Sequence, residues 1–157
     1  MGDYFVAHQE PGSRRVRKFS RDNHSPRECV IKIESDADVV IARRKGRSMA
    51  ADIGFEPRDL TRITAAISEL ARNIIAYAKR GEIVLLSIDQ EKRQGIAVVS
   101  RDDGPGIRDL SQAMRDGFST SGRLGLGLPG VKRLMDEFEI VSELGRGTAV
   151  TVRKWKS

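Results

Sequence analysis

Hydrophobic residues recur along this chain with two different periods, and the clearest helical period lies in its middle. From about Arg58 to Lys79 apolar residues return every three or four positions, the spacing of one face of an α-helix. Pro57 suits the start of such a helix because its missing N–H needs no partner there, and Gly81 can end it. The stripe consists of Leu60, Ile63, Ile67, Leu70, Ile74 and Tyr77.

Shorter apolar runs predict the remaining elements. A strand from Cys29 to Ile33 is followed by a helix that reaches about Ile53. Ser35 or Asp36 can cap this helix by accepting its free N–H bonds, and Gly54 offers the left-handed stop. Three further elements follow: a hairpin around the polar run 90–94, a third helix, and a second hairpin around Gly145 and Gly147. The strands of the first hairpin are Glu82 to Asp89 and Gly95 to Arg101, and the helix runs from Leu128 to Phe138. The strands of the second hairpin are Glu139 to Leu144 and Thr148 to Trp155.

The predicted order is therefore β-α-α-β-β-α-β-β. Paired strands separated by groups of helices favour one sheet with helices on one face over a doubly wound parallel sheet. We expect an α/β two-layer sandwich whose sheet is mixed and largely antiparallel. The chain has 157 residues, 39% of them hydrophobic and 32% charged, which suffices for one domain with a buried core and without disulfides.

Composition narrows the classes of function. The net charge of +6 is accompanied by only 5% aromatic residues, so no stacking platform is apparent and we expect no nucleic-acid partner. Positive charge serves nucleotide phosphates or an acidic protein surface equally well. No stretch approaches the roughly 20 apolar residues that cross a bilayer, and the N-terminus lacks a secretory signal. We therefore expect a cytoplasmic protein without a membrane partner.

The N-terminal segment differs from the rest of the chain. Residues 1–27 combine Arg and Lys with Gly, Pro and Ser and show no periodic apolar pattern, so we interpret them as a flexible basic tail before a domain at 28–157. His8 and His24 both lie there, so a proton acceptor in the domain must be a carboxylate or another group. Cys29 is the single cysteine, which excludes a disulfide within the chain.

The central helix carries the first candidate residues. Glu69 and Asn73 lie one turn apart, so both side chains point to the same side of the helix. A carboxylate there can take a proton from an attacking hydroxyl, and a carboxamide oxygen can coordinate Mg²⁺, which prefers oxygen ligands. By themselves, two such residues on an exposed helix face are usually only solvated.

A carboxylate beside a glycine turn follows the second strand of the first hairpin. Asp102 begins the run Asp-Asp-Gly-Pro-Gly, in which Gly104 and Gly106 let the backbone approach a ligand closely. An ionised Asp only accepts hydrogen bonds, so Asp102 can recognise an exocyclic amino group such as that of adenine. The alternative is an ordinary acidic β-turn.

The run from Phe118 to Gly130 is rich in hydroxyls and glycines and leads into the third helix. Hydroxyls, exposed backbone N–H groups and a helix N-terminus together form an anion site that suits phosphate. A solvated loop is the alternative. The candidate phosphate-binding residues are Ser119, Thr120, Ser121, Gly122, Arg123, Gly125, Leu126 and Gly127.

Two common nucleotide-binding motifs are excluded. The glycines at 125, 127 and 130 match G-x-G-x-x-G, but that fingerprint should follow the first strand of a βαβ unit, and here it follows a polar loop. No Gly-Lys-Ser/Thr triplet completes a Walker phosphate loop. The Gly-Arg-Gly-Thr run of the last hairpin instead adds the hydroxyl of Thr148 near the end of a strand, although Gly-x-Gly-Thr is otherwise ordinary turn chemistry.

In this order, the four elements resemble the N box, the two glycine boxes and the terminal Gly-Thr motif of the GHKL family of ATP-binding proteins. The resemblance covers about residues 30–155 and implies the Bergerat fold, with ATP and Mg²⁺ as cofactors. It implies that Glu69 is the catalytic base, Asn73 the Mg²⁺ ligand and Asp102 the adenine-binding residue. The other matching positions are Gly104 and Gly106 for the first glycine turn, Gly125 and Gly127 beside the phosphates, and Thr148 near adenine.

Within that family, the runs at 68–73, 116–122 and 125–138 are similar to the serine/threonine switch kinases of bacterial stressosomes. This resemblance implies an ATP-dependent kinase that phosphorylates STAS-domain scaffold and antagonist proteins. Once released, such a kinase activates a PPM-type phosphatase or another downstream output. The residues before Arg27 depart from the compact form of the family.

Other functions stay open. An anti-sigma factor kinase has the same implied fold and differs mainly in its partner. A binding module that sequesters partners without turnover would use nucleotide only as a structural ligand. The catalytic domain of a histidine kinase is disfavoured, because the sequence has no helix that presents a phosphoacceptor histidine.

Overall fold

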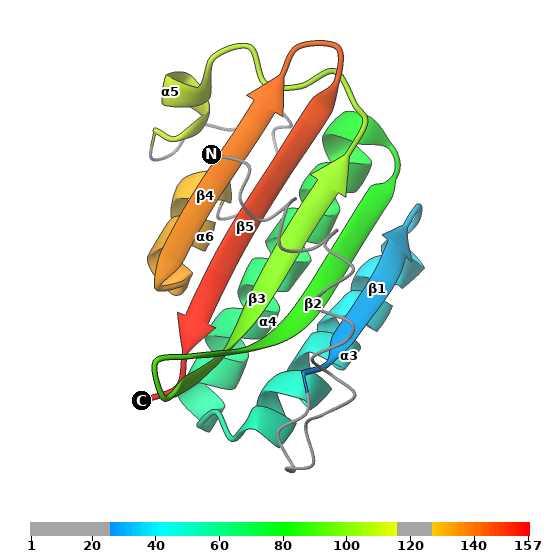
Figure 1. Ribbon diagram of the computed structural model, residues 1–157. Helices are drawn as coiled ribbons and strands as arrows, with labels where there is room; N and C mark the ends of the chain where they lie inside the picture. The colour runs from blue at the N-terminus through cyan, green and yellow to red at the C-terminus, as the bar shows by residue number, and fades with distance from the viewer. Residues whose placement is uncertain (1–25, 116–126) are drawn as a thin grey trace.

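The computed structural model describes residues 26–115 and 127–157, in which five strands form one sheet (Figure 1). The strands are β1 (Glu28–Ile33), β2 (Gly81–Gln90), β3 (Arg93–Asp102), β4 (Glu137–Glu143) and β5 (Gly147–Trp155). Their spatial order is β1-β2-β3-β5-β4, and each of these neighbouring pairs is antiparallel. The predicted two-layer α/β sandwich is confirmed, with an antiparallel sheet in place of the mixed one.

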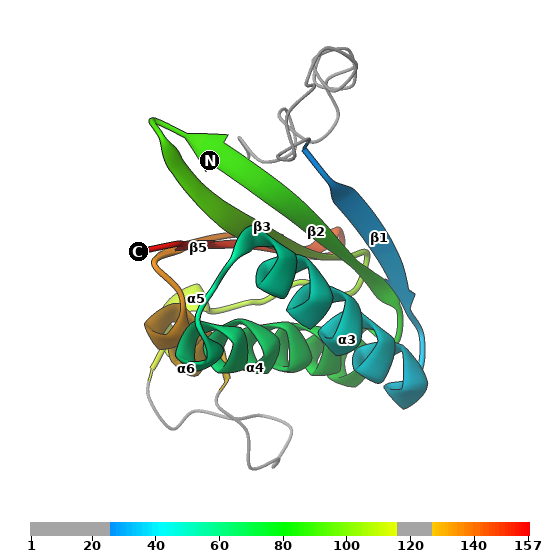
Figure 2. The ribbon, with the colours of Figure 1, turned by 90° about the horizontal axis from the view of Figure 1, so that it is seen from below.

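Helices form the second layer, and they lie against a single face of the sheet (Figure 2). They are α3 (Asp36–Ile53), α4 (Pro57–Asn73) and α6 (Gly127–Leu134). At its C-terminal end α4 continues into a π-helical turn, η2 (Ile74–Ala78), and a short helix, α5 (Leu110–Ala113), lies in the connection after β3. Because α4 runs beneath the sheet toward the end where β3 terminates, its last turns approach the Asp102 turn.

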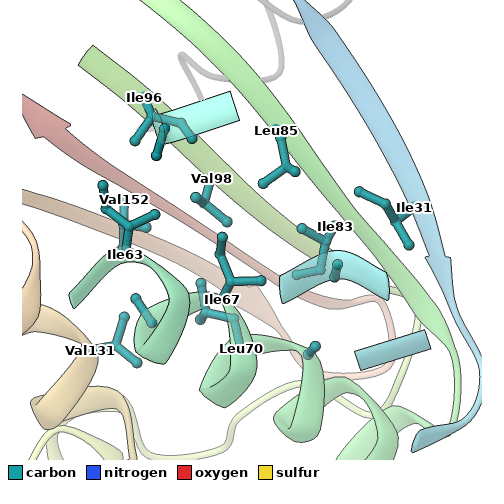
Figure 3. Close-up of a cluster of buried hydrophobic side chains, with 14 of the residues drawn as sticks. Ile31, Ile63, Ile67, Leu70, Ile83, Leu85, Ile96, Val98, Val131 and Val152 are labelled. Atoms are coloured by element: carbon teal, nitrogen blue, oxygen red, sulfur yellow. The ribbon is translucent and has the colours of Figure 1, made fainter. Parts of the chain in front are cut away.

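The hydrophobic core lies between the sheet and the helices (Figure 3). Alternate side chains of each strand point to the helices, where they meet the apolar stripe of α4. Burying one such isoleucine or leucine stabilises the fold by about 1.5–3 kcal/mol relative to leaving it exposed. The residues labelled in the figure, each at most 5% exposed, are Ile31, Ile63, Ile67, Leu70, Ile83, Leu85, Ile96, Val98, Val131 and Val152.

The helix α3 begins and ends where the sequence predicts. Ser35 is the N-cap residue, and the carboxylate of Asp38 accepts hydrogen bonds from the backbone N–H groups of Glu34 (2.9 Å) and Ser35 (3.0 Å). These bonds stabilise the ionised form, so the pKa of Asp38 lies below its usual value, with the Glu34 N–H as the largest cause. Gly54 takes the left-handed conformation that ends the helix, with φ of 107°.

The central helix ends differently from the prediction. Regular α-helix stops at Asn73, the π turn follows, and Lys79 rather than Gly81 takes the positive φ, at 71°. A π turn holds more residues than an α turn, so the residues after Ile74 rotate away from the buried stripe. Tyr77 is therefore 47% exposed, and its assignment to the apolar stripe is wrong.

The third helix is shorter than predicted. It ends at Leu134, and Phe138 lies in β4, where it packs against the core from the sheet. Between the helix and β4 lies Asp136, whose N–H donates to the carbonyl of Arg153 (2.9 Å) and whose carboxylate accepts from the N–H of Trp155 (2.8 Å). These contacts with β5 are distant in sequence and override the local helical period.

The first hairpin is confirmed, but its turn is tighter than the predicted five-residue connection. The strands β2 and β3 extend to Gln90 and Arg93, and only Glu91 and Lys92 join them. Both residues have positive φ, at 51° and 66°, as a two-residue hairpin turn of the favoured twist requires. Glycine normally fills such positions, so the sequence contained no signal for this turn.

The predicted tail falls on residues of which 1–25 lie outside the described part of the chain. Arg27, the last residue of that range, is bonded to the domain: its N–H donates to Ser87 Oγ (2.7 Å), its carbonyl accepts from the Ser87 N–H (2.9 Å) and its guanidinium pairs with Asp52 (2.9 Å). Across 26–115 and 127–157, no helix has the length and apolar character to cross a bilayer.

Replacement of Ile67 by alanine tests whether the α4 stripe carries the core. Ile67 has no exposed surface, so Ile67→Ala should lower the free energy of unfolding by about 2–5 kcal/mol in urea titrations. Ile41→Ala, on the outer side of α3 at 42% exposed, is the matched control and should change it by about 0.5 kcal/mol or less. Equal losses in the two variants would contradict the assigned core.

Candidate functional site

The carboxylate of Asp102 joins the end of β3 to the start of β5. Its Oδ1 accepts hydrogen bonds from the backbone N–H of Gly104, at 2.9 Å, and from that of Thr148 at the start of β5, at 3.3 Å. Within the described residues the other oxygen, Oδ2, has no hydrogen-bond partner. One oxygen of the carboxylate therefore holds the site together, and the second is available to accept a hydrogen bond from a ligand.

The environment of Asp102 disfavours its charge. Burial raises the pKa of this carboxyl above its usual value, and the neighbouring charge of Asp103 adds to the rise. The N–H groups of Gly104 and Thr148 oppose the rise because they stabilise the ionised form, but burial is the larger effect. A hydrogen-bond donor from a ligand would compensate this carboxylate for the water that it has lost.

The glycines around Asp102 allow the turn to pack closely against its neighbours. A side chain at Gly104 would place its Cβ 2.6 Å from the Cβ of Ala78 in the π turn. A Cβ on Gly147, which has a φ of 116°, would overlap the carbonyl oxygen of Asp102, and one on Gly106 would overlap that of Glu143. The predicted first glycine turn is thus wedged between the helix layer and the last hairpin.

The same close packing brings the end of α4 to Asp102. A Cβ built on Gly81 would lie 2.9 Å from Ile74 Cγ2 and 3.1 Å from Asp102 Cβ, so both residues border one glycine. Ile74 directly follows Asn73, the last residue of α4. The structure therefore brings the predicted amide and the predicted adenine-binding carboxylate into one region, although they are 29 positions apart in the sequence.

Glu69 and Asn73 lie on the last turn of α4. Glu69 is 9% exposed, and its Oε1 lies 3.7 Å from Nη1 of Arg72, whereas Asn73 is half-buried. The carboxamide oxygen of Asn73 fits Mg²⁺, because this ion takes oxygen ligands and usually needs only one or two from the protein beside water and phosphate. The donor chemistry of α4 is thus compatible with a nucleotide-bound metal.

Thr148 lies beside a residue that the sequence analysis missed. Its Oγ1 is 2.9 Å from Oγ of Ser142 on β4, which also accepts a hydrogen bond from the N–H of Ile107 at 2.7 Å. The two hydroxyl residues pair directly across the last hairpin and are equally distant from Gly145. The sequence signal for this pair was the equal distance of both residues from the predicted turn, since side chains at equal distance from a hairpin turn face each other on opposite strands.

A cavity of about 890 Å³ lies at the end of the sheet where β3 terminates. Asp102 and Thr148 line it, but Glu69 and Asn73 do not. Most of its remaining wall is charged, including the paired side chains of Glu82 and Arg101. The cavity therefore contains the proposed base-recognition residues, while the acid and amide of α4 belong to the helix side.

The predicted phosphate-binding run lies largely outside the described residues. Of the candidate phosphate-binding residues only Gly127 is described, as the first residue of α6 with φ of 64°. The positions that lie in the gap are Ser119, Thr120, Ser121, Gly122, Arg123, Gly125 and Leu126. Their role in binding phosphate stays a prediction.

Known proteins place this chain in a family. Residues 33–154 match the family described as histidine kinase-like ATPase domain, so the chain belongs to that family. The match spans both layers of the sandwich and the residues of the site, from the end of β1 to the end of β5. The predicted membership of the GHKL ATP-binding class is confirmed.

Two known proteins are similar to this chain over most of their length. The chain is 50% identical over 128 residues to the serine/threonine-protein kinase RsbT of Bacillus subtilis, covering 82% of this chain and 96% of that protein. It is 31% identical over 128 residues to an anti-sigma F factor of Caldanaerobacter subterraneus subsp. tengcongensis, covering 78% and 85% of the two chains.

Among solved structures, the fold matches that of the RsbU and RsbW domains of Rv1364c from Mycobacterium tuberculosis. The TM-score is 0.55 at 20% identity, over 84% of this chain. The chain spans about a third of that larger protein, 33%. This likeness supports the two-layer fold alone.

The close approach of the last hairpin to Asp102 can be tested with two glycines of that hairpin. Gly145→Ala should lower the free energy of unfolding by about 1–2 kcal/mol, because alanine must adopt the left-handed conformation at φ of 79°, but its Cβ meets nothing within 4 Å. Gly147→Ala should lose clearly more, since its Cβ would also overlap the Asp102 carbonyl. Chemical denaturation of both variants decides; similar losses would contradict the assigned contact.

Proposed function

We propose that this protein is an ATP-dependent serine/threonine protein kinase. The observation that carries the proposal is the approach of the Asn73 end of α4 to Asp102, whose second carboxylate oxygen is available to a ligand. Membership of a histidine kinase-like ATPase family and 50% identity to a protein named as a serine/threonine kinase support it. ATP is the nucleotide that this arrangement suits.

Base recognition starts from Asp102. Its Oδ2 accepts a hydrogen bond from the exocyclic amino group of adenine, and a buried carboxylate makes this bond stronger than an exposed one. Thr148 adds a hydroxyl beside it, anchored to the same carboxylate through its N–H. The phosphates would then extend toward the N-terminus of α6, where the helix dipole favours negative charge.

Phosphoryl transfer uses the last turn of α4. The hydroxyl of a serine or threonine on the partner gives its proton to the carboxylate of Glu69, its oxygen forms a bond to the γ-phosphorus, and the bond from that phosphorus to the ADP oxygen breaks. Asn73 would hold Mg²⁺ through its carboxamide oxygen, and a bound ion would supply positive charge that neutralises the phosphates. Glu69 is nearly buried, so few water molecules compete with the partner's hydroxyl for it.

The partners follow from the likeness to switch kinases. STAS-domain scaffold and antagonist proteins are the proposed substrates, and a PPM-type phosphatase or another regulator is the proposed target of the released kinase. Both partners imply a site of action in the cytoplasm. The relation to RsbT supports this choice, because that relative is matched over nearly its whole length.

The second candidate function is an anti-sigma factor kinase. Several relatives near 30% identity are named anti-sigma F factors, which makes a sigma factor the alternative partner. The two functions separate in one pull-down, in which the full chain is offered a STAS-domain protein and a sigma factor from the same organism. Retention of the sigma factor alone would favour the alternative.

The assignment of the base predicts the behaviour of Glu69→Gln. The amide cannot accept the hydroxyl proton, so the rate of transfer from labelled ATP to a STAS-domain partner should fall about 100-fold or more. ATP affinity measured by calorimetry should change by about twofold or less, since the side chain does not contact the base. Glu91→Gln, in the turn at the opposite end of the sheet, is the matched control and should keep full activity. A fully active Glu69→Gln variant removes Glu69 from the role of base.

Asp102→Asn separates binding from stability. Asparagine keeps an acceptor for the N–H groups of Gly104 and Thr148 but lacks the charge, so ATP should bind about tenfold or more weakly. Because burial raises the folded-state pKa of Asp102, the folded protein holds this proton more tightly than the unfolded chain, and the associated stability is lost as pH rises through that pKa. At neutral pH the variant should therefore be at least as stable as the parent to heat.

The same carboxyl predicts a pH dependence of ATP binding. Protonation removes the charged acceptor, so affinity should fall as the pH drops through the raised pKa of Asp102, starting above the ordinary aspartate value of 3.8. Calorimetric titration at a series of pH values measures this decrease in ATP affinity. Adenine itself protonates in acid, so the pH dependence of ATP affinity is compared with that of Asp102→Asn. This variant should lack the part of the decrease in affinity that Asp102 causes, and identical pH profiles of the two proteins would contradict the assignment.

A further inference from the structure

Ser142 occupies a junction between three parts of the site. Its Oγ accepts from the N–H of Ile107, at 2.7 Å, just after the first glycine turn. The same oxygen lies 2.9 Å from Thr148 Oγ1 and 3.3 Å from the carbonyl oxygen of Gly147. Ser142 is half-buried on β4, and nothing in the proposed kinase mechanism uses it.

The number of hydroxyl protons at this junction determines whether Thr148 can donate a hydrogen bond to a ligand. A serine hydroxyl has one proton to donate and two lone pairs. The Ile107 N–H occupies one lone pair of Ser142, so its proton goes either to Thr148 Oγ1 or to the Gly147 carbonyl. The 2.9 Å contact with Thr148 can be made with either hydroxyl as the donor. If Thr148 donates, the Ser142 proton is left for the Gly147 carbonyl at 3.3 Å, which is longer than the usual 2.5–3.0 Å of hydroxyl hydrogen bonds, so donation from Ser142 to Thr148 is favoured.

When Ser142 donates to Thr148, the proton of the Thr148 hydroxyl is free for a ligand. Thr148 then acts as a donor beside Asp102, which acts only as an acceptor. This pair of an acceptor and a donor matches the Watson–Crick edge of adenine, where an amino group that donates lies next to a ring nitrogen that accepts. A guanine presents a carbonyl oxygen and a ring N–H at the same positions, the reverse pattern.

We propose that Ser142 is a positioning residue that keeps the Thr148 hydroxyl as a donor and thereby favours adenine over guanine nucleotides. The proposal rests on the ATP site described under the proposed function. It adds a residue of β4 to that site, although β4 lies at the edge of the sheet farthest from β1. Ser142 acts through Thr148 and touches no reacting atom.

The alternative role of Ser142 is purely structural. Its bond to Ile107 and the bond from the Gly145 N–H to the Pro105 carbonyl, at 2.9 Å, both fasten the last hairpin to the glycine turn. A residue with only this role would change the free energy of unfolding without changing the preference between bases. The ratio of ATP to GTP affinity therefore separates the two roles.

The experiment measures ATP and GTP dissociation constants of the full chain and of four variants, Ser142→Ala, Thr148→Val, their combination and Ser142→Thr. Ser142→Ala should weaken ATP binding about tenfold, or about 1.4 kcal/mol, and narrow the preference for ATP over GTP. In the Thr148→Val background the same change should have no further effect, because its target is gone. Ser142→Thr keeps a hydroxyl on the strand and should restore the preference.

Thr151→Val is the matched control. Thr151 lies on β5 three residues beyond Thr148, is 1% exposed, and its Oγ1 has no hydrogen-bond partner in the described part of the chain. Its removal tests the loss of a buried strand hydroxyl outside the junction. Both dissociation constants should stay at the values of the unmodified protein.

The outcomes distinguish this proposal from the proposed function. An unmodified protein that binds no ATP overturns both. ATP binding that is lost in Asp102→Asn but unaltered in Ser142→Ala, with an unaltered ATP-to-GTP ratio, overturns the role of Ser142 alone. Equal losses from Ser142→Ala in the presence and absence of the Thr148 hydroxyl do the same, because they show that Ser142 does not act through Thr148.

Discussion

The site depends on one carboxylate that is shared between two strands. Oδ1 of Asp102 accepts from the N–H of Gly104 and from that of Thr148, and so connects the end of β3 to the beginning of β5. These two donors partly offset the cost of burying the charge, which the raised pKa of Asp102 reflects. An acceptor that burial has left short of partners is suited to a ligand that brings its own donor.

Close packing of backbone, rather than long side chains, holds the rest of the site in place. The glycine turn touches the π turn through Gly104 and Ala78, and the last hairpin through Gly147 and the Asp102 carbonyl. Since α4 runs directly into that π turn, the position of Asn73 depends on the same contacts. In the proposed mechanism, base recognition and phosphoryl transfer are therefore coupled through a few van der Waals contacts between small residues.

The π turn itself has a consequence for chemistry. Continuation of α4 as an α-helix would keep Tyr77, three residues after Ile74, on the buried stripe. The wider turn instead exposes Tyr77 and is followed by the positive φ of Lys79. The chain can then enter β2 at Gly81, between Ile74 and Asp102. Such turns are rare inside helices and are often found at functional sites, and this one directly follows Asn73, the proposed Mg²⁺ ligand.

The sequence by itself determined the layers, the order of the elements and the identity of the family, because hydrophobic periods and motif spacing are local properties. It also placed Glu69 and Asn73 on one helix face and Asp102 at the end of a strand. Only the tertiary structure decided the end of α4, the strand position of Phe138, the tight turn at Glu91 and Lys92, and the contact between Ser142 and Thr148. Each of these depends on residues far apart in the chain, whose hydrogen bonds and packing outweigh the local preference of the segment.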